Sequence, residues 1–181
     1  MKEKVMQAVT KSAVLVALLC FLQWIIGYTE SFAGPYLADS CIICILAMAA
    51  LREDLKVSVS AAVLFPFCAY FLGIGAEILQ IVPAIALGDC VLVVLLRLLG
   101  GQKGKSPVQK IISVAVSALV RFIVLYCAII KVTIPVMGPA LPAKQAAVIR
   151  AAYSWPQLVT ALIGTAAAVL LCLLIKKFSK K

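Results

Sequence analysis

The sequence contains no histidine and few charged residues. Among its 181 residues there are 0 His, and Asp, Glu, Lys and Arg together make up 13%. Without histidine the chain lacks any His-based catalytic triad, histidine general base or H-E-x-x-H zinc motif. A glycine-rich P-loop and a dinucleotide-binding fingerprint are also missing from the sequence. These absences predict a protein that is not an enzyme, uses no cofactor or metal, and relies on other chains for any ATP hydrolysis.

The scarcity of charge also argues against a soluble protein. Soluble domains have about 25% charged and about 45–50% apolar residues, whereas 65% of this chain is hydrophobic and its mean hydropathy is +1.14. One crossing of a bilayer core takes roughly 20 helical residues, so six crossings use about 120 and leave only short loops. We therefore predict an all-α membrane protein in which residues 1–181 form a single bundle of six transmembrane helices.

Six apolar segments are long enough to be the predicted helices. The first of them follows several lysines and precedes Ser31-Phe32-Ala33, an arrangement that imitates a signal peptide with its cleavage site. Because its apolar run can span a bilayer and further spans follow, we expect it to be retained. The sequence AKQAAVIRAA, in the long loop before the last segment, predicts a short surface helix. The predicted spans cover about 5–28, 37–51, 57–73, 78–99, 109–132 and 153–176.

The basic residues lie mainly on one side of this arrangement. The net charge is +10, but no nucleic-acid-binding motif accompanies it. Cytoplasmic loops carry the excess of Lys and Arg, so the distribution predicts that both termini are cytoplasmic, with only Lys131, Lys144 and Arg150 on the outer side. The thirteen residues on the cytoplasmic side are Lys2, Lys4, Lys11, Arg52, Lys56, Arg97, Lys103, Lys105, Lys110, Lys176, Lys177, Lys180 and Lys181.

Five aromatic residues fall near the outer boundary of the predicted spans. Trp and Tyr favour membrane interfaces, so simple anchoring explains them. Their clustering on one side also suits a pocket that opens outward and offers stacking surfaces, and both interpretations stay open. The five are Trp24, Tyr28, Tyr36, Tyr153 and Trp155.

Cys41 and Cys44 form a C-x-x-C pair inside the second apolar segment. Such pairs can be redox-active or bind metal, but a zinc site needs four ligands and the sequence offers neither a second pair nor a histidine. A spacing of three residues places both thiols on one helix face. We therefore expect these cysteines to be structural.

Two charged residues interrupt apolar segments near the middle of the membrane. Asp89 lies about eleven residues from the outer end of its segment and Arg121 about twelve from the inner end of the next, which at 1.5 Å per residue gives them similar depths. An unpaired charge there costs at least about 2.5–3.5 kcal/mol, so we predict an Asp89–Arg121 pair. The pair either belongs to a ligand site or proton relay, or only fixes the helix register. Asp39, at the outer start of its segment, fits either a favourable helix N-terminal charge or a ligand contact.

Small residues recur at intervals of four on two segments. Ala13 and Ala17 lie in the first, and Thr160, Gly164 and Ala168 lie in the last. Stripes of this kind let helices approach closely in lipid.

Taken together, these features resemble a substrate-binding S component of an energy-coupling factor (ECF) vitamin transporter. The resemblance rests on the six-helix layout, on AVLVA (13–17) at the place of an Ala-x-x-x-Ala motif, and on SWPQLVTALIG (154–164). It rests also on VLFPFCAYFLGIGAEILQIVPAIALGDCVLVVLLRLL (63–99), which has Gly88-Asp89 where the family has Gly-Asn.

The resemblance implies a subunit in the bacterial plasma membrane that binds a micronutrient from outside. It would dock through Ala13 and Ala17 onto a transmembrane coupling subunit served by two cytoplasmic ATPases. The resemblance also implies a pocket in the outer half, built by the last three spans. By position, the candidates for that pocket are Asp89, Arg121, Trp155 and Gln157, followed by Tyr28 and Asp39.

The identity of the substrate stays open at this level. Arg121 suits a carboxylate or phosphate and Asp89 an amine or ring N–H, so a zwitterion would match both, whereas a neutral ligand would follow if the two charges neutralise each other. Two other functions also fit the sequence. One is a stand-alone proton-coupled carrier that uses Asp89 and Arg121, and the other is a scaffold protein in which these charges only fix the register.

Overall fold

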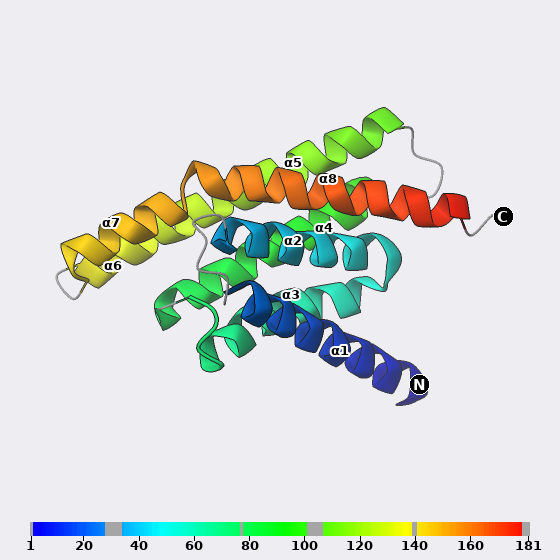
Figure 1. Ribbon diagram of the computed structural model, residues 1–181, viewed down its shortest axis with the longest axis horizontal. Helices are drawn as coiled ribbons and strands as arrows, with labels where there is room; N and C mark the ends of the chain where they lie inside the picture. Colours follow the sequence, from blue (N-terminus) through cyan, green and yellow to red (C-terminus); the bar gives the residue numbers. More distant parts are fainter. Residues whose placement is uncertain (1, 28–33, 77, 101–106, 139–140, 179–181) are drawn as a thin grey trace.

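The computed structural model describes residues 2–27, 34–76, 78–100, 107–138 and 141–178, and within these ranges the chain is helical, without strands (Figure 1). The six long helices expected from the sequence are present. The elements are α1 (Lys2–Gly27), α2 (Gly34–Arg52), α3 (Leu55–Phe71), η1 (Leu79–Ile81), α4 (Val82–Gly100), α5 (Pro107–Leu125), η2 (Tyr126–Thr133), α6 (Ile134–Met137), α7 (Ala143–Ala152) and α8 (Trp155–Phe178).

Five helical stretches are long and apolar enough to cross a membrane. They contain α1, α2, α4, the continuous run from α5 to α6, and the run from α7 to α8. The remaining long helix, α3, is apolar but has only 17 residues and contains Pro66. A proline within a helix removes one backbone hydrogen bond, which a membrane bundle tolerates where neighbouring helices surround it. The prediction of an all-α membrane bundle is confirmed.

The long helices run back and forth, so both ends of the chain lie at the same end of the bundle (Figure 1). We call this the terminal end and the opposite one the distal end. The terminal end also holds the junction of α2 with α3, the last turn of α4 and the start of α5. Basic residues occur at each of these places, as the alternation predicts: Arg52, Lys56, Arg97, Lys110, Lys176 and Lys177.

Most helix boundaries differ from the predicted ones by a few residues, and two of the differences involve a proline. α2 begins at Gly34 rather than near residue 37, because Pro35 is favourable in a first helical turn, where its missing N–H is not needed. The fifth helix does not end near residue 132 but continues through the π-helical η2 and α6 to Met137. Pro135 lies within this continuous run, directly after the π-helical η2. The predicted short helix in AKQAAVIRAA is present as α7.

The run from α5 to α6 and the run from α7 to α8 extend past the other helices at the distal end. In Figure 1, α6 and α7 lie at the far left, where they form the tip of a hairpin made with α5 and α8. A separate apolar cluster stabilises this hairpin, and it includes Leu125, Ile129, Ile134, Leu141 and Ile149. The long loop expected from the sequence is therefore largely helical.

Two glycines lie where helices approach closely. A Cβ atom on Gly88 of α4 would lie 2.9 Å from Cγ of Leu125 on α5. A Cβ on Gly164 of α8 would lie 2.5 Å from the carbonyl oxygen of Ser40 on α2. Thr160 and Ala168, the other members of the predicted stripe on α8, are buried as well. The stripe therefore serves close packing of α8 against α2, as its spacing predicts.

Candidate functional site

The predicted pair of charges is present in the interior of the bundle. Nε of Arg121 donates a hydrogen bond of 2.9 Å to Oδ1 of Asp89, and both side chains are only 2% exposed. The close approach of α4 and α5 at Gly88, one residue before Asp89, brings the two helices into contact at this level. The prediction from their equal depth is confirmed.

The other two nitrogens of the guanidinium group also have partners. Nη2 of Arg121 lies 3.5 Å from Oδ1 of Asp39 on α2, and Nη1 donates a hydrogen bond of 3.0 Å to Oε1 of Gln157 on α8. The hydroxyl of Thr160 in turn donates to Oδ2 of Asp39. We call these five residues (Asp39, Asp89, Arg121, Gln157 and Thr160) the polar network. It links α2, α4, α5 and α8 through a single cation.

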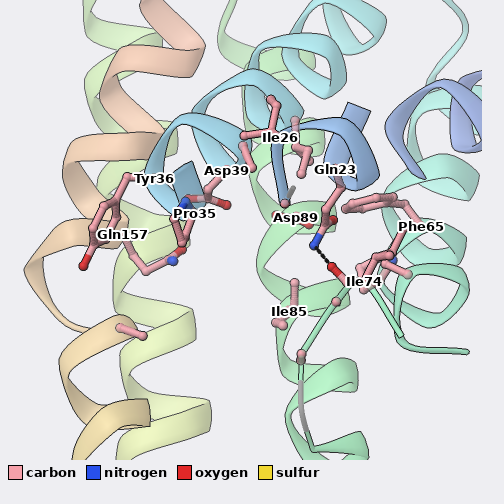
Figure 2. A pocket seen from close by; sticks show the side chains of 18 of the residues that line it. Gln23, Ile26, Pro35, Tyr36, Asp39, Phe65, Ile74, Ile85, Asp89 and Gln157 are labelled. Carbon is pink, nitrogen blue, oxygen red and sulfur yellow. Dashed lines mark hydrogen bonds between the residues drawn. The ribbon is translucent and has the colours of Figure 1, made fainter. Parts of the chain in front are cut away.

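A cavity of about 730 Å³ lies against the polar network. Its volume falls in the range of about 300–1,000 Å³ that is usual for small-molecule sites. Four members of the network line it, namely Asp39, Asp89, Arg121 and Gln157, and much of the remaining wall is apolar or aromatic (Figure 2). Among the other lining residues are Gln23, Tyr36, Ile42, Phe65, Pro66, Ile74, Ile85 and Tyr153.

The cavity lies in the distal half of the bundle. Its wall includes the end of α1, the start of α2 and residues 74–76, which follow α3. On one side Nε2 of Gln23 donates a hydrogen bond of 2.5 Å to the carbonyl oxygen of Ile74 (Figure 2). This bond connects the end of α1 to the segment between α3 and α4. The first three long helices therefore contribute to a cavity that, by the family resemblance, was expected to be built by the last three spans.

The predicted site residues divide into three groups. Asp39, Asp89, Arg121 and Gln157 meet at the cavity, as described above. Trp155 does not line it and is 69% exposed. Two residues correspond to about 200° of rotation around a helix, so Trp155 and Gln157 point in nearly opposite directions from α8. Tyr28 lies outside the described residues.

Several lining residues were missed by the sequence analysis. Gln23 is the most informative, because a polar side chain inside an apolar span is the same signal that singled out Asp89. Phe65 carried no such signal, since aromatic residues are common in membrane helices. The five boundary aromatics separate by role where they are described: Tyr36 and Tyr153 line the cavity, whereas Trp24 and Trp155 are largely exposed.

The predicted partner-binding residues lie elsewhere on the molecule. Ala13 and Ala17 are exposed on α1, whose spanning stretch is the least buried of the five. They face away from the core, which α1 reaches through Val16, Leu19 and Cys20.

Comparison of the chain with known proteins found no match. No family model, no curated protein and no solved structure matches it.

Proposed function

We propose that this chain is the substrate-binding subunit of an ATP-driven importer for a vitamin-like micronutrient. It is a multi-pass protein of the bacterial plasma membrane and works as the S components that its sequence resembles do. The observation that carries the proposal is the cavity of about 730 Å³ in the distal half, closed on one side by the buried polar network. A concave, mostly apolar site with a few converging polar groups is the usual form of a small-molecule pocket.

The charge distribution supports an outward-facing site. Basic residues gather at the terminal end, and the positive-inside rule places such an end in the cytoplasm. The cavity then lies in the outer half of the membrane, where an importer captures its substrate. The chain has no nucleotide-binding motif, so in this proposal two cytoplasmic ATPase subunits supply the energy.

The exposed face of α1 supports docking to a coupling subunit. Ala13 and Ala17 are small, exposed and separated by one helical turn, which lets a partner helix approach closely in lipid. A bulky side chain at Ala17 should therefore prevent docking without disturbing the cavity, which α1 lines only near its end.

A tagged pull-down from native membranes in mild detergent tests the proposal. Wild type should recover a transmembrane coupling subunit and ATPase subunits, and Ala17→Leu should lose them. Ala115→Leu is the matched control, because Ala115 is an exposed alanine on another helix, α5. Recovery of no such subunit by folded, abundant wild type, or equal recovery by Ala17→Leu, contradicts the proposal.

A proton-coupled carrier is the second candidate. It is favoured by Asp89, a carboxylate that lines the cavity in the membrane interior and is only 2% exposed. In a carrier that works alone, Asp89→Asn should abolish the response of transport to a pH gradient. In an ATP-driven importer the same substitution should alter ligand affinity and leave transport insensitive to that gradient.

A further inference from the structure

The described wall of the cavity carries one uncompensated negative charge. Among the described residues, the charged side chains that line the cavity are the carboxylates of Asp39 and Asp89 and the guanidinium of Arg121. Arg121 bonds most directly to Asp89, at 2.9 Å, and lies farther from Asp39, at 3.5 Å. The pairing therefore leaves Asp39 as the less compensated of the two carboxylates.

Arg121 is poorly placed to receive an anionic ligand. Each of its three guanidinium nitrogens has a protein partner within 3.5 Å, and its side chain is 2% exposed. These contacts use three of its five N–H donors. A carboxylate or phosphate would have to bind the remaining two on an almost fully buried side chain, or displace Asp89, Asp39 or Gln157. Displacing a carboxylate from this cation would leave that carboxylate buried and unpaired, which is strongly destabilising.

Asp39 is the charged group that a ligand can reach. Its side chain is 23% exposed, compared with 2% for both Asp89 and Arg121. An ionised carboxylate offers about four acceptor sites, and the described contacts of Asp39 are with Arg121 and the hydroxyl of Thr160. Acceptor capacity therefore remains on the side that faces the cavity.

The aromatic part of the wall is suited to the same kind of charge. Tyr36, Phe65 and Tyr153 all line the cavity. Faces of aromatic rings attract cations, and several of them around one site are the usual means of holding an ammonium group. The rest of the wall, including Ile42, Ile74 and Ile85, is apolar and suits the carbon skeleton of a small organic molecule.

From these observations we propose that the cavity binds a small organic cation, with its ammonium or ring-nitrogen charge held against Asp39. This assignment deepens the importer proposal and rests on it for the direction of transport. The sequence leaves open whether the substrate is a zwitterion or neutral. The structure instead favours a ligand with a net positive charge.

Probes that share a shape and differ in charge test this preference. Purified full-length chain in a neutral maltoside detergent is titrated with benzylamine, benzyl alcohol and benzoate, and with choline and its neutral isostere 3,3-dimethylbutan-1-ol. Thermal unfolding reports binding. The two cations should bind at least about tenfold more tightly than their neutral isosteres, equivalent to about 1.4 kcal/mol, and benzoate should bind most weakly. Equal binding within each set, no stabilisation by either cation, or tighter binding of benzoate overturns the proposal.

A variant that removes the charge of Asp39 tests whether this residue causes the preference for cations. Asp39→Asn should lose the advantage of the cations over their neutral isosteres. Glu53→Gln is the matched control, because Glu53 pairs with Lys11 at 2.6 Å near the terminal end and is not a lining residue of the cavity. If folded Asp39→Asn still binds the cations more tightly than their neutral isosteres, the role of Asp39 is contradicted. If that variant does not fold, the probes on wild type still decide the ligand class.

The outcome is separable from that of the importer proposal. Recovery of ATPase subunits together with a preference for benzoate would support the importer and overturn the cation assignment. A preference for the cations without recovery of those subunits would support the cation assignment and overturn the importer proposal.

Discussion

Arg121 is the residue around which the polar interactions of the membrane interior are organised. A lone charge at this depth is costly, and here one guanidinium bonds to Asp89 and Gln157 and lies near Asp39. Its planar group with five donors can serve several acceptors at once, which a lysine ammonium cannot do in the same geometry. This one side chain thereby connects four helices, α2, α4, α5 and α8.

Replacing Arg121 should therefore be strongly destabilising. Arg121→Gln should lower the free energy of unfolding by about 3–5 kcal/mol, because Asp89 is then buried without a counter-charge. The double variant Arg121→Gln/Asp89→Asn should lose less than Arg121→Gln alone, since it leaves no unpaired carboxylate at that position. Denaturant unfolding in detergent measures both values. A double variant that is less stable than the single one would contradict this view of the pair.

The residues of the site were only partly predictable from the sequence. Asp89 and Arg121 stood out because charge in an apolar span has few explanations, and their equal depth implied contact. Asp39 was harder to assign, because a carboxylate at the start of a helix is also favourable with the helix dipole. Its link to Arg121 depends on how α2 lies relative to α5, which one-dimensional spacing does not reveal. Trp155 was misplaced for a similar reason, since the direction in which it points depends on the rotation of α8.

At the scale of elements, two glycines illustrate how closely the helices pack. At Gly164 an added Cβ would meet the backbone of α2, whereas at Gly88 it would meet the side chain of Leu125. Backbone cannot move aside as a side chain can, so the two positions should differ in their tolerance of alanine.

Gly164→Ala should destabilise the protein by about 1–3 kcal/mol, the usual range for overpacking. Gly88→Ala should cost less, because Leu125 can change its rotamer. Gly27→Ala is the control, since nothing lies within 4 Å of an added Cβ there. Melting temperatures of the three variants in one detergent test the order. A larger loss for Gly88→Ala than for Gly164→Ala would contradict it.

The helices themselves were well predicted, because length and hydropathy alone identify membrane spans. Their ends were less certain. Pro35 and Pro135 lie outside the predicted spans, yet both are helical in the structure. Pro35 lies in the first turn of α2, where proline's fixed φ angle is favourable, and Pro135 lies in the run from η2 to α6. The π-helical η2 had no sequence signal that hydropathy can detect.

At the scale of the whole molecule, the bundle is polarised by charge. The terminal end carries most of the basic residues, and the cavity lies in the other half. The positive-inside rule predicts that the hairpin formed around α6 and α7 is outside the cell and that both termini are inside.

Cysteine labelling in intact cells tests this orientation. In a background where the seven native cysteines are replaced by serine, Lys144→Cys on α7 should react with a membrane-impermeant maleimide. Lys176→Cys, near the end of α8, should react only after the cells are opened. Both side chains are exposed in the structure, so a difference in labelling reports the side of the membrane. The opposite pattern would invert the topology and place the cavity toward the cytoplasm.

The central claim is that the cavity beside the polar network holds a small molecule, and native mass spectrometry tests it most directly. Wild type purified from its own membranes should carry a small-molecule adduct of defined mass. Ala38→Phe, which fills the cavity from α2, should lack that adduct, and Ala115→Phe, on the exposed surface of α5, should retain it. An adduct that persists in Ala38→Phe, or a wild type that carries none and takes up none from a cell extract, would contradict the account.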